Sequence, residues 1–365
     1  MNWKKMLKSM GISMGVCLAL VVGVMVAYSQ MVQEPDVDVD RPPVLRPPDS
    51  TNRDNNQDDW YRDFTGAFVN MPGSINDTWD DWIRRESFFT MLVLALDEYR
   101  NADVMWVVSF CTILHEMHIV DIPRDIRVTA ADRNVQRINA AFANGRNRDG
   151  HEEGVRQAKR EVAWLIGFQV DFYVIVEMRM FARAVDEILG GVTVTVPHRM
   201  EYYSPGQNLH INLAAGTQRL NGTQAVHFAR WRQNTDHTGN IGTEGRMENI
   251  FHLFNALVRE AWSGMPGILL QLPNFINMYN RYVHTDLGAS YMMFFGEQFL
   301  RNDVSIHFHR IPVSFITSPR WYDVPYHDET LEIINNSINP FIRDIRVIMP
   351  DELPILLQDF EEDIE

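Results

Sequence analysis

Two arginines separated by one residue, Arg230 and Arg232, are the side chains of this sequence best suited to chemistry on a phosphate. They lie near the end of the stretch 210–233, where TQAVHFAR reads as a short helix or an extended run. If both arginines lie on a strand, its two-residue period puts the guanidinium groups on one face and Trp231 on the other. Two planar forks side by side suit a diphosphate better than a lone carboxylate. The alternative interpretation is a solvated strand edge with two unrelated arginines.

The charge of the chain limits its partners. The 365 residues carry a formal net charge of −15, and the sequence pI is about 5.2. This balance argues against bulk nucleic-acid binding, so no nucleic acid is expected as a partner. An acidic protein that binds an anion must gather its arginines locally. The two cysteines, Cys17 and Cys111, indicate neither a disulfide framework nor a cysteine metal site.

The N-terminus has the pattern of a membrane anchor. Residues 1–8 are basic, and residues 9–28 contain no charged side chain. At about 1.5 Å per residue, a helix of this length spans roughly 30 Å, the thickness of a bilayer's hydrocarbon core. Because lysines precede the run and acidic residues follow it, the positive-inside rule puts the N-terminus in the cytoplasm and the rest outside the cell membrane. A cleaved signal peptide is the alternative, but the long apolar run and weak cleavage site favour an uncleaved anchor.

The composition of the chain after residue 28 predicts one large domain with flanking segments. Residues 29–58 are rich in proline, aspartate and asparagine without apolar periodicity, which is typical of an extended spacer. Globular patterning begins at about residue 87. The predicted division is a cytoplasmic tail at 1–8, a transmembrane anchor at 9–28, a spacer and pre-domain segment at 29–86, a domain at 87–345 and an acidic tail at 346–365.

Within the domain, strand-like and helix-like patterns alternate. Short apolar runs predict strands, and apolar residues at helical spacing predict helices. The expected strands are 88–96, 104–110, 115–123, 171–178, 192–197 and 304–312. The expected helices are 151–167, 181–191, 245–261, 268–282 and 328–342. This alternation predicts an α/β fold with helices on both faces of a sheet.

Several of these segments, in order, resemble one known family. They include LVLALDEYRNADVMWVVSF, IVDIPRDIRV, QRINAAFANG, DFYVIVEMRMFARAVDEILGGVTVTVP and LAAGTQRLNGTQAVHFARWR, followed by YVHTDLG and DETLEIINNSINPF. Together they resemble the LytR-CpsA-Psr family, the membrane-anchored phosphotransferases of bacterial cell walls. The resemblance covers about 88–343, and the ordered combination is specific where no single segment is.

The resemblance implies a fold, an activity and partners. The fold is a central mixed sheet flanked by helices, with a hydrophobic pocket for a lipid tail. Family members bind a polyprenyl-pyrophosphate-linked glycopolymer and transfer its phosphoglycosyl part to a peptidoglycan acceptor, assisted by Mg²⁺. We therefore expect a single-pass cell-membrane protein with an extracytoplasmic domain.

The resemblance also implies a site. Asp97 and Asp103 stand at the family's magnesium positions, and Mg²⁺ takes hard oxygen ligands such as carboxylates and phosphates. The alternative for this pair is two strand-end aspartates without a metal. Four arginines match the positions that hold the pyrophosphate and stabilise charge in the transition state. These arginines are Arg124, Arg230, Arg232 and Arg246.

Two further matches have weaker roles. Arg137 and Asn139 match the family's next segment, where they either line the pocket or hold the loop. Asp125 is expected to orient Arg124 or to cap a turn.

The sequence departs from the family pattern after the paired arginines. The family's Asp-X-Gly-Arg-X-X-Arg-Gln has Asn240 in place of the acid, Thr243 in place of the first arginine and Met247 in place of the glutamine. Asp236 is a candidate to replace the acid. A neutral side chain cannot supply the charge or the fork of an arginine.

A second departure lies upstream. The family's arginine two residues before the second aspartate is Asn101 here, and Arg100 could substitute for it only if the loop bends differently. The sequence therefore leaves two functions open. The first is the phosphotransferase, and the alternative is a catalytically impaired relative that binds lipid diphosphate or wall polymer as a regulator or scaffold.

Other metal patterns are weaker. His115 and His118 are three residues apart rather than four, so the zinc-protease spacing fails. His307 and His309 would share a strand face, with no third ligand evident from the sequence.

Overall fold

The structure is a computed structural model that describes residues 32–37, 83–128, 136–207, 209–270, 283–301, 304–317 and 320–345. Among these residues, no helix combines the length and the apolar character needed to cross a membrane. The cytoplasmic tail at 1–8, the anchor at 9–28 and the acidic tail at 346–365 lie outside the described residues, as does most of the helix expected at 268–282.

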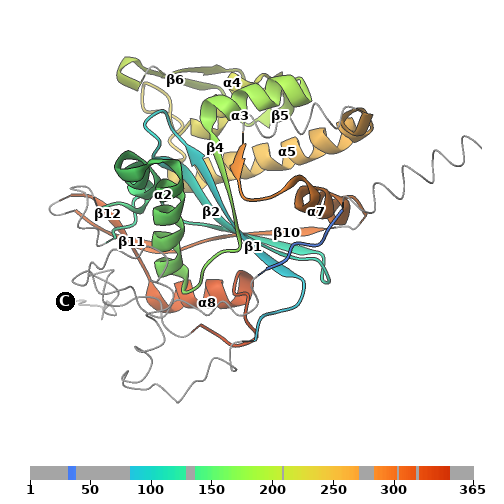
Figure 1. Cartoon of the computed structure of the whole chain (residues 1–365). Coiled ribbons are helices and arrows are strands. Elements are labelled where there is room, and N and C mark those ends of the chain that lie inside the picture. Colours follow the sequence, from blue (N-terminus) through green and yellow to red (C-terminus); the bar gives the residue numbers. More distant parts are fainter. Residues whose placement is uncertain are drawn as a thin grey trace, which may run out of the picture.

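A six-stranded mixed sheet forms the centre of the molecule (Figure 1), with strand order β10-β3-β2-β1-β4-β9. The β1–β2, β2–β3 and β4–β9 pairs are antiparallel, whereas β1–β4 and β3–β10 are parallel. The strands are β1 Phe88–Leu96, β2 Ala102–Cys111, β3 Glu116–Asp121, β4 Phe172–Glu177, β9 Val283–Thr285 and β10 Ser305–Arg310.

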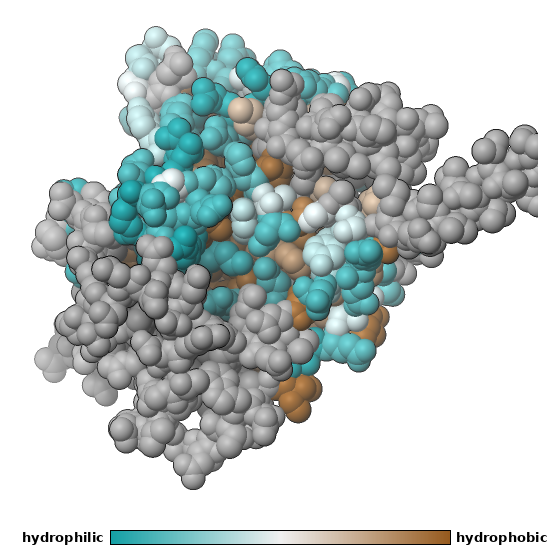
Figure 2. Space-filling model, in the orientation of Figure 1, coloured by the Kyte–Doolittle hydropathy of each residue, from teal (hydrophilic) through white to brown (hydrophobic). Residues whose placement is uncertain are grey.

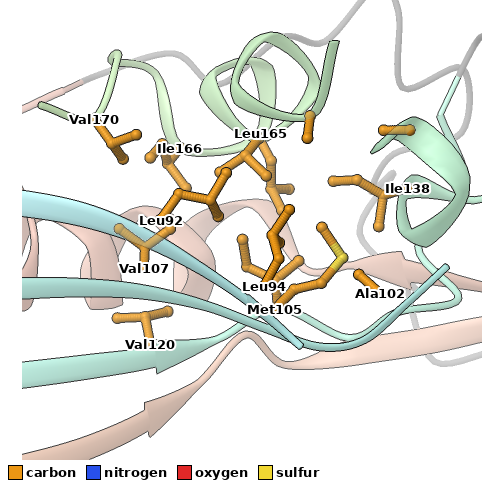
Figure 3. Close-up of a cluster of buried hydrophobic side chains, with 14 of the residues drawn as sticks. Leu92, Leu94, Ala102, Met105, Val107, Val120, Ile138, Leu165, Ile166 and Val170 are labelled. Carbon is orange, nitrogen blue, oxygen red and sulfur yellow. The ribbon is translucent and has the colours of Figure 1, made fainter. Parts of the chain in front are cut away.

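Alternating side chains of the strands build one core on the face covered by α2 (Ala141–Ile166) and α8 (His327–Ser337). Leu92 and Leu94 of β1 are at most 1% exposed and point to this face. Leu165 of α2 packs over them, as Figure 3 shows. Each such side chain stabilises the fold by about 1.5–3 kcal/mol when buried.

The opposite face is covered by α5 (Gly242–Leu270) and α7 (Ala289–Arg301). Trp106 of β2 contacts Phe254 of α5 edge to face, at 6.1 Å between ring centroids. Phe89 of β1 meets the aromatic rings of α7 in the same way. Figure 2 shows hydrophobic atoms near α7 on an otherwise mainly hydrophilic surface. Helices on both faces confirm the expected α/β class.

A second block of short strands and helices packs against α5 and has its own core. Its antiparallel pairs are β5–β8 and β6–β7. Gly222 approaches Ala182 so closely that a Cβ atom would lie 1.8 Å from the Ala182 carbonyl oxygen, which restricts this position to glycine. The elements are α3 Met178–Ala184, β5 Val192–Val196, β6 Met200–Ser204, β7 Leu209–Leu213, β8 Gly216–Leu220 and α4 Gly222–Arg230.

A hairpin of β11 (Val313–Ile316) and β12 (Tyr322–Pro325) joins the loop that follows β3. Asp323 of β12 pairs with Ile126 in this loop. The Arg127 amide donates to the Asp323 carbonyl at 3.0 Å, and the Asp323 amide donates to the Asp125 carbonyl at 2.9 Å. Residues 125–127, which follow β3, are therefore held to β12 by backbone hydrogen bonds in both directions.

The expected strands are present, most of them with shifted ends, while three expectations about helices need correction. The helix expected at 245–261 is longer, because α5 runs without a break from Gly242 to Leu270. The helix expected at 151–167 begins earlier, at Ala141, and non-helical backbone at Asp149 and Gly150 divides it. The helix expected at 328–342 ends at Ser337. Gly150 has φ +82, a conformation that glycine adopts without strain and that breaks the helical run.

Candidate functional site

A pocket of about 520 Å³ lies where the main sheet meets the second block. The β1–β2 loop and the loop after β3 form one side, and the β6–β7 turn, the end of α4 and the start of α5 form the other. Its lining residues are Asp97, Glu98, Tyr99, Asp103, Arg124, Tyr202, Gly206, Leu209, Arg230, Arg232, Gln233, Asn240, Gly242 and Arg246. All four arginines and both aspartates predicted to be central to the site therefore share one pocket.

The paired arginines reach this pocket from a helix end rather than from a strand. Arg230 is the last residue of α4, and Trp231 caps the helix with extended backbone (φ −64, ψ 138). Trp231 is fully buried in the core of the second block. Of the two alternatives for TQAVHFAR, the structure shows the helix. Arg230 and Arg232 nevertheless lie apart from Trp231, because Trp231 packs in the core while the two arginines line the pocket.

The start of α4 fixes where the paired arginines fall. Asn221 caps the helix, since its Oδ1 accepts from the Gln224 amide at 2.8 Å. The Gln224 side chain returns a hydrogen bond by accepting from the Asn221 amide at 3.0 Å. Arg230 lies in the last turn, where the helix dipole favours a cation.

Arg124 lies in the loop after β3 and pairs with Asp103 at the start of β2. Its Nη1 donates to Asp103 Oδ1 at 2.5 Å. Asp125 lies 3.7 Å from the Arg124 Nε through its Oδ2, and its Oδ1 is 3.0 Å from Arg137 Nη1. Arg124 is therefore held from two sides, in agreement with the expected orienting role of Asp125.

Arg246 is the most deeply buried arginine of the pocket, with 6% of its surface exposed. It lies near the start of α5, and its two Nη atoms donate to the Asp103 carbonyl at 3.4 Å each. Burial, followed by the charge of Arg232, lowers the pKa of the Arg246 guanidinium to about 10. A buried cation beside the positive end of a helix is costly. An anion bound in the pocket would offset this cost.

Arg232 experiences the same crowding of positive charge. Burial, and next the charge of Arg124, lower the pKa of the Arg232 guanidinium, while Asp103 and Asp125 act in the opposite direction. The pocket holds four arginines against three carboxylates, Asp97, Glu98 and Asp103, in a chain of net charge −15. This local gathering of guanidinium groups beside a helix N-terminus is suited to a phosphate-bearing ligand.

The two aspartates predicted to bind magnesium already have protein partners. Asp97 Oδ1 accepts from the amides of Tyr99 and Asn101 at 2.8 Å each, which closes the β1–β2 turn. Asp103 Oδ1 is engaged by Arg124. Within the described ranges, no group of three or more His, Cys, Asp or Glu side chains could hold a metal alone. Two carboxylates in one pocket fit Mg²⁺ only if phosphate oxygens and water complete its shell, which is its usual mode of binding.

The proposed replacements for the missing family residues do not line the pocket. Arg100 has left-handed backbone (φ +66) in the tight β1–β2 turn and is absent from the lining. Asp236 is exposed, and its Oδ1 accepts from the Thr238 amide and hydroxyl. Asn240, at the family's acid position, does line the pocket, and its Oδ1 accepts from the Gly242 amide at 2.9 Å.

Arg137 and Asn139 hold the loop rather than lining the pocket. Arg137 Nη2 donates to the Trp321 carbonyl at 2.9 Å, and its guanidinium also lies over the Tyr322 ring. The Asn139 amide donates to the Arg124 carbonyl at 3.3 Å. Of the two interpretations that the sequence left open, the geometry favours loop support.

Two residues beneath the pocket were missed by the sequence analysis. Asp121 ends β3, and Arg310 ends β10; they are paired in the parallel register. Burial raises the pKa of the Asp121 carboxyl to about 6, although Arg310 and then Arg246 act to lower it. The only local signal for Asp121 was a charged residue at the end of an apolar strand, two residues before the Pro-Arg-Asp segment.

Three of the four histidines singled out from the sequence form a stacked column elsewhere. His118 lies between His307 and His309, with ring centroids 4.8 Å and 5.3 Å away. His118 Nδ1 and His309 Nε2 are 3.0 Å apart. A third histidine is therefore present, but in the described chain no such group meets the geometry for a metal.

Three comparisons relate this fold to known proteins. The chain is 22% identical to the regulatory protein MsrR of Staphylococcus aureus strain Mu50 over 237 residues, covering 63% of this chain and 66% of MsrR, just under two thirds. It is 27% identical over 201 residues to the polyisoprenyl-teichoic acid–peptidoglycan teichoic acid transferase TagU of Oceanobacillus iheyensis, covering 54% of this chain and 58% of TagU. Its fold is similar to that of TagT bound to LI-WTA, at 18% identity and a TM-score of 0.51, covering 69% of this chain and 91% of TagT.

The family itself is shown by a match that spans most of the chain. The model of the LytR_cpsA_psr family covers residues 73–337 of the 365. This range contains the central sheet, the second block and every residue that lines the pocket. The chain therefore belongs to the LytR-CpsA-Psr family.

Proposed function

We propose that this protein is a membrane-anchored, extracytoplasmic phosphotransferase that moves a glycopolymer from a polyprenyl-pyrophosphate carrier to peptidoglycan. The observation that carries the proposal is the convergence of four arginines and two aspartates in one pocket of about 520 Å³. TagU is by name a transferase that joins polyisoprenyl-linked teichoic acid to peptidoglycan, and TagT binds LI-WTA. The pocket of this chain is consistent with a reaction of the same class as the one that TagU is named for.

The arginines would hold the two phosphates and stabilise charge as the phosphate bond breaks. Arg230 and Arg232 come from one side of the pocket, and Arg124 comes from the other. Arg246 lies beneath the start of β2, hydrogen-bonded to the Asp103 carbonyl. Removing one preorganised donor of this kind typically costs 10²–10³ in rate.

Asp97 and Asp103 would hold a Mg²⁺ ion together with the pyrophosphate oxygens. When bound, the ion would neutralise charge on the leaving polyprenyl phosphate. A hydroxyl of the acceptor attacks the phosphorus that carries the glycosyl group, and the bond to the polyprenyl phosphate breaks. The hydroxyl proton passes to a carboxylate of the pocket, for which Asp97 and Asp103 are the first candidates.

A second function, lipid-diphosphate binding without turnover, is favoured by one observation. Asn240 occupies the family's acid position inside the pocket, so one family carboxylate is absent from the site. MsrR is itself named a regulatory protein. In this case the chain would bind the carrier as a regulator or scaffold.

One assay separates the two functions. The full-length chain in detergent receives a short-chain polyprenyl pyrophosphate with and without Mg²⁺, and release of polyprenyl phosphate is followed. Mg²⁺-dependent release that is lost in Arg232→Ala supports the transferase. Binding without release supports the regulator, and the absence of both contradicts the proposal.

A further inference from the structure

Beneath the pocket lies a buried carboxylate that the proposed mechanism does not use. Asp121 is 4% exposed and ends β3 on the α5 face of the sheet. The charged groups that face it are Arg310 from β10 and Arg246 from α5. The residue opposite Asp121 on the neighbouring strand β2 is Trp106. Two arginines from separate elements thus share one buried aspartate.

The geometry is poor for a stabilising salt bridge. The closest contact joins Arg310 Nε and Asp121 Oδ2 at 3.8 Å, too long for a hydrogen bond. Burial raises the pKa of the Asp121 carboxyl to about 6 despite both arginines, so its ionised form costs folding free energy at neutral pH. A residue kept only for stability would be expected to make closer contacts.

The neighbouring arginines are also incompletely paired. Among the described residues, the buried Nε of Arg246 and Nη1 of Arg310 have no hydrogen-bond partner. The charge of Arg310 also helps to lower the pKa of the Arg232 guanidinium, which places Arg310 within electrostatic reach of the pocket. The cluster therefore gathers more positive charge than its protein partners neutralise.

These observations point to a second layer of the site. We propose that Asp121 is a positioning residue that holds the guanidinium groups of Arg246 and Arg310 together beneath the pocket, so that both act on a bound pyrophosphate. Asp121 supplies the negative charge that offsets repulsion between the two arginines. Arg310 then adds a cation in a chain whose sequence has Thr243 in place of a family arginine. The inference rests on the proposed pyrophosphate ligand, but it does not require turnover.

The test therefore measures binding rather than activity. Isothermal titration calorimetry of the full-length chain with geranyl pyrophosphate and Mg²⁺ compares the parent with Asp121→Asn, which removes the charge at nearly constant shape. We expect the dissociation constant to rise tenfold or more, because charge-assisted contacts to the phosphates weaken. The melting temperature should not fall, since the ionised carboxylate is costly in the fold.

Asp171→Asn provides a matched control. Asp171 is also buried and paired with an arginine, but it lies at the start of β4, outside the pocket lining. This variant should lower the melting temperature and leave the dissociation constant unchanged. The opposite outcomes of the two variants would distinguish positioning from structural support.

Arg310 offers a second route if Asp121→Asn does not fold. Its side chain is 26% exposed, so Arg310→Gln and Arg310→Lys are expected to fold. Gln should weaken binding and Lys should retain most of it, because Lys keeps the charge. Parent-like binding by Arg310→Gln and by any folded Asp121→Asn would overturn the inference while leaving the proposed function intact. A parent that does not bind geranyl pyrophosphate would overturn both.

Discussion

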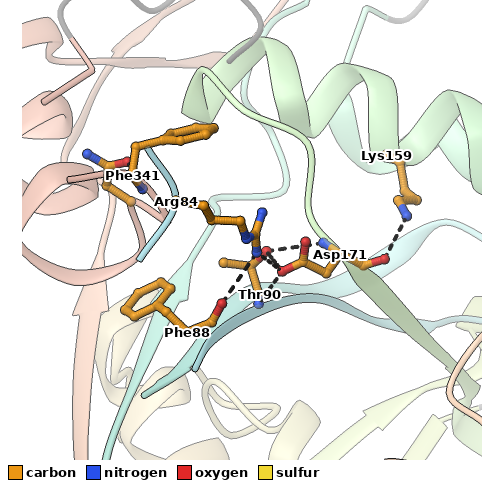
Figure 4. Close-up of polar contacts among 7 residues, drawn as sticks. Arg84, Phe88, Thr90, Lys159, Asp171 and Phe341 are labelled. Atoms are coloured by element: carbon orange, nitrogen blue, oxygen red, sulfur yellow. Dashed lines mark hydrogen bonds and ion pairs between the residues drawn. The ribbon is translucent and has the colours of Figure 1, made fainter. Parts of the chain in front are cut away.

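Two aspartate–arginine pairs with a buried carboxylate, at opposite ends of the central sheet, use the same residue types in different ways. The Arg84–Asp171 pair lies beside the start of β1, as Figure 4 shows. Its side chains are 4% and 3% exposed. Asp171 Oδ2 accepts from the Thr90 amide and hydroxyl at 2.8 Å each. The Asp171 amide donates back to the Thr90 hydroxyl at 3.1 Å. This carboxylate is closely surrounded by donors.

At the other end of the sheet, Asp121 and Arg310 approach only to 3.8 Å, and the pKa of the Asp121 carboxyl is raised to about 6. Native structures satisfy nearly all buried polar groups, and exceptions need a reason. The difference indicates that the Arg84–Asp171 pair serves stability, whereas the Asp121–Arg310 pair accepts a cost to keep positive charge near a ligand.

The largest expected effect is loss of turnover without loss of stability. Arg232→Ala should lower the rate of polyprenyl phosphate release by about 10²–10³. Its melting temperature should be unchanged or higher, because burial penalises the charged guanidinium, as its lowered pKa indicates. Kinetics and thermal denaturation of the same preparation measure both quantities.

Arg199→Ala serves as the control for Arg232→Ala. Arg199 is 57% exposed and pairs with Glu201 on the surface of the second block, outside the pocket lining. It should change neither the rate nor the melting temperature. Equal rate losses in the two variants would show that general loss of positive charge, rather than the pocket, limits turnover.

The Arg84–Asp171 pair should show the reverse pattern. Asp171→Asn leaves Arg84 buried without a counter-charge, and such changes typically destabilise by about 3–5 kcal/mol. The rate per folded molecule should not change, since neither residue lines the pocket. Urea denaturation with activity normalised to the folded fraction measures this. A fall in the normalised rate would mean that the start of β1 communicates with the site.

A smaller effect is expected at Asn240, whose side chain accepts a hydrogen bond from Gly242, the first residue of α5. Asn240→Asp keeps an acceptor for the Gly242 amide and adds a negative charge at a helix N-terminus. This should stabilise the protein by about 0.3–1 kcal/mol at low salt. Asn212→Asp, an exposed site on β7, is the control for the change in net charge.

The same variant tests whether having Asn240 in place of the family's acid limits catalysis. If Asn240→Asp also raises the release of polyprenyl phosphate, the missing acid impairs the parent. If release stays absent while the carrier binds, the regulatory function is favoured. A loss of binding would show that the arginine pocket does not tolerate another carboxylate.

The sequence predicted which side chains come together in the pocket better than it predicted the ends of the elements that carry them. The apolar runs at β1, β2 and β4 were strong enough to place the strands, and the resemblance placed Arg124 and Arg246. The sequence left a helix or an extended run open for TQAVHFAR, and the structure shows a helix that the capping box at Asn221 starts. Propensity over a few residues does not decide between the two.

The pairing of Asp121 with Arg310 beneath the pocket could not be predicted, for a different reason. Asp121 and Arg310 are far apart in the sequence, and their pairing depends on the parallel register of β3 and β10. Arg100 and Asp236 seemed able to replace missing groups because they are close in sequence to the relevant positions. Local turns determine otherwise, since Arg100 has φ +66 and Asp236 binds Thr238.

The smallest expected effect comes from the histidine column. Burial first, and then His309 and His307, lower the pKa of His118, while burial and His307 lower that of His309. Protons therefore bind more weakly in the folded state than to an unfolded histidine of pKa about 6.5. Stability should be fully present above pH 6.5 and should fall as the pH drops through the lowered folded values.

Urea denaturation at several pH values between 7.5 and 5 measures this loss, which should be well below that of Asp171→Asn. His309→Gln should flatten the slope of stability against pH, because it removes one buried titrating group and its charge on His118. His252→Gln, which changes an exposed histidine on α5, should leave the slope unchanged. An equally steep slope in His309→Gln would place the acid sensitivity outside the column.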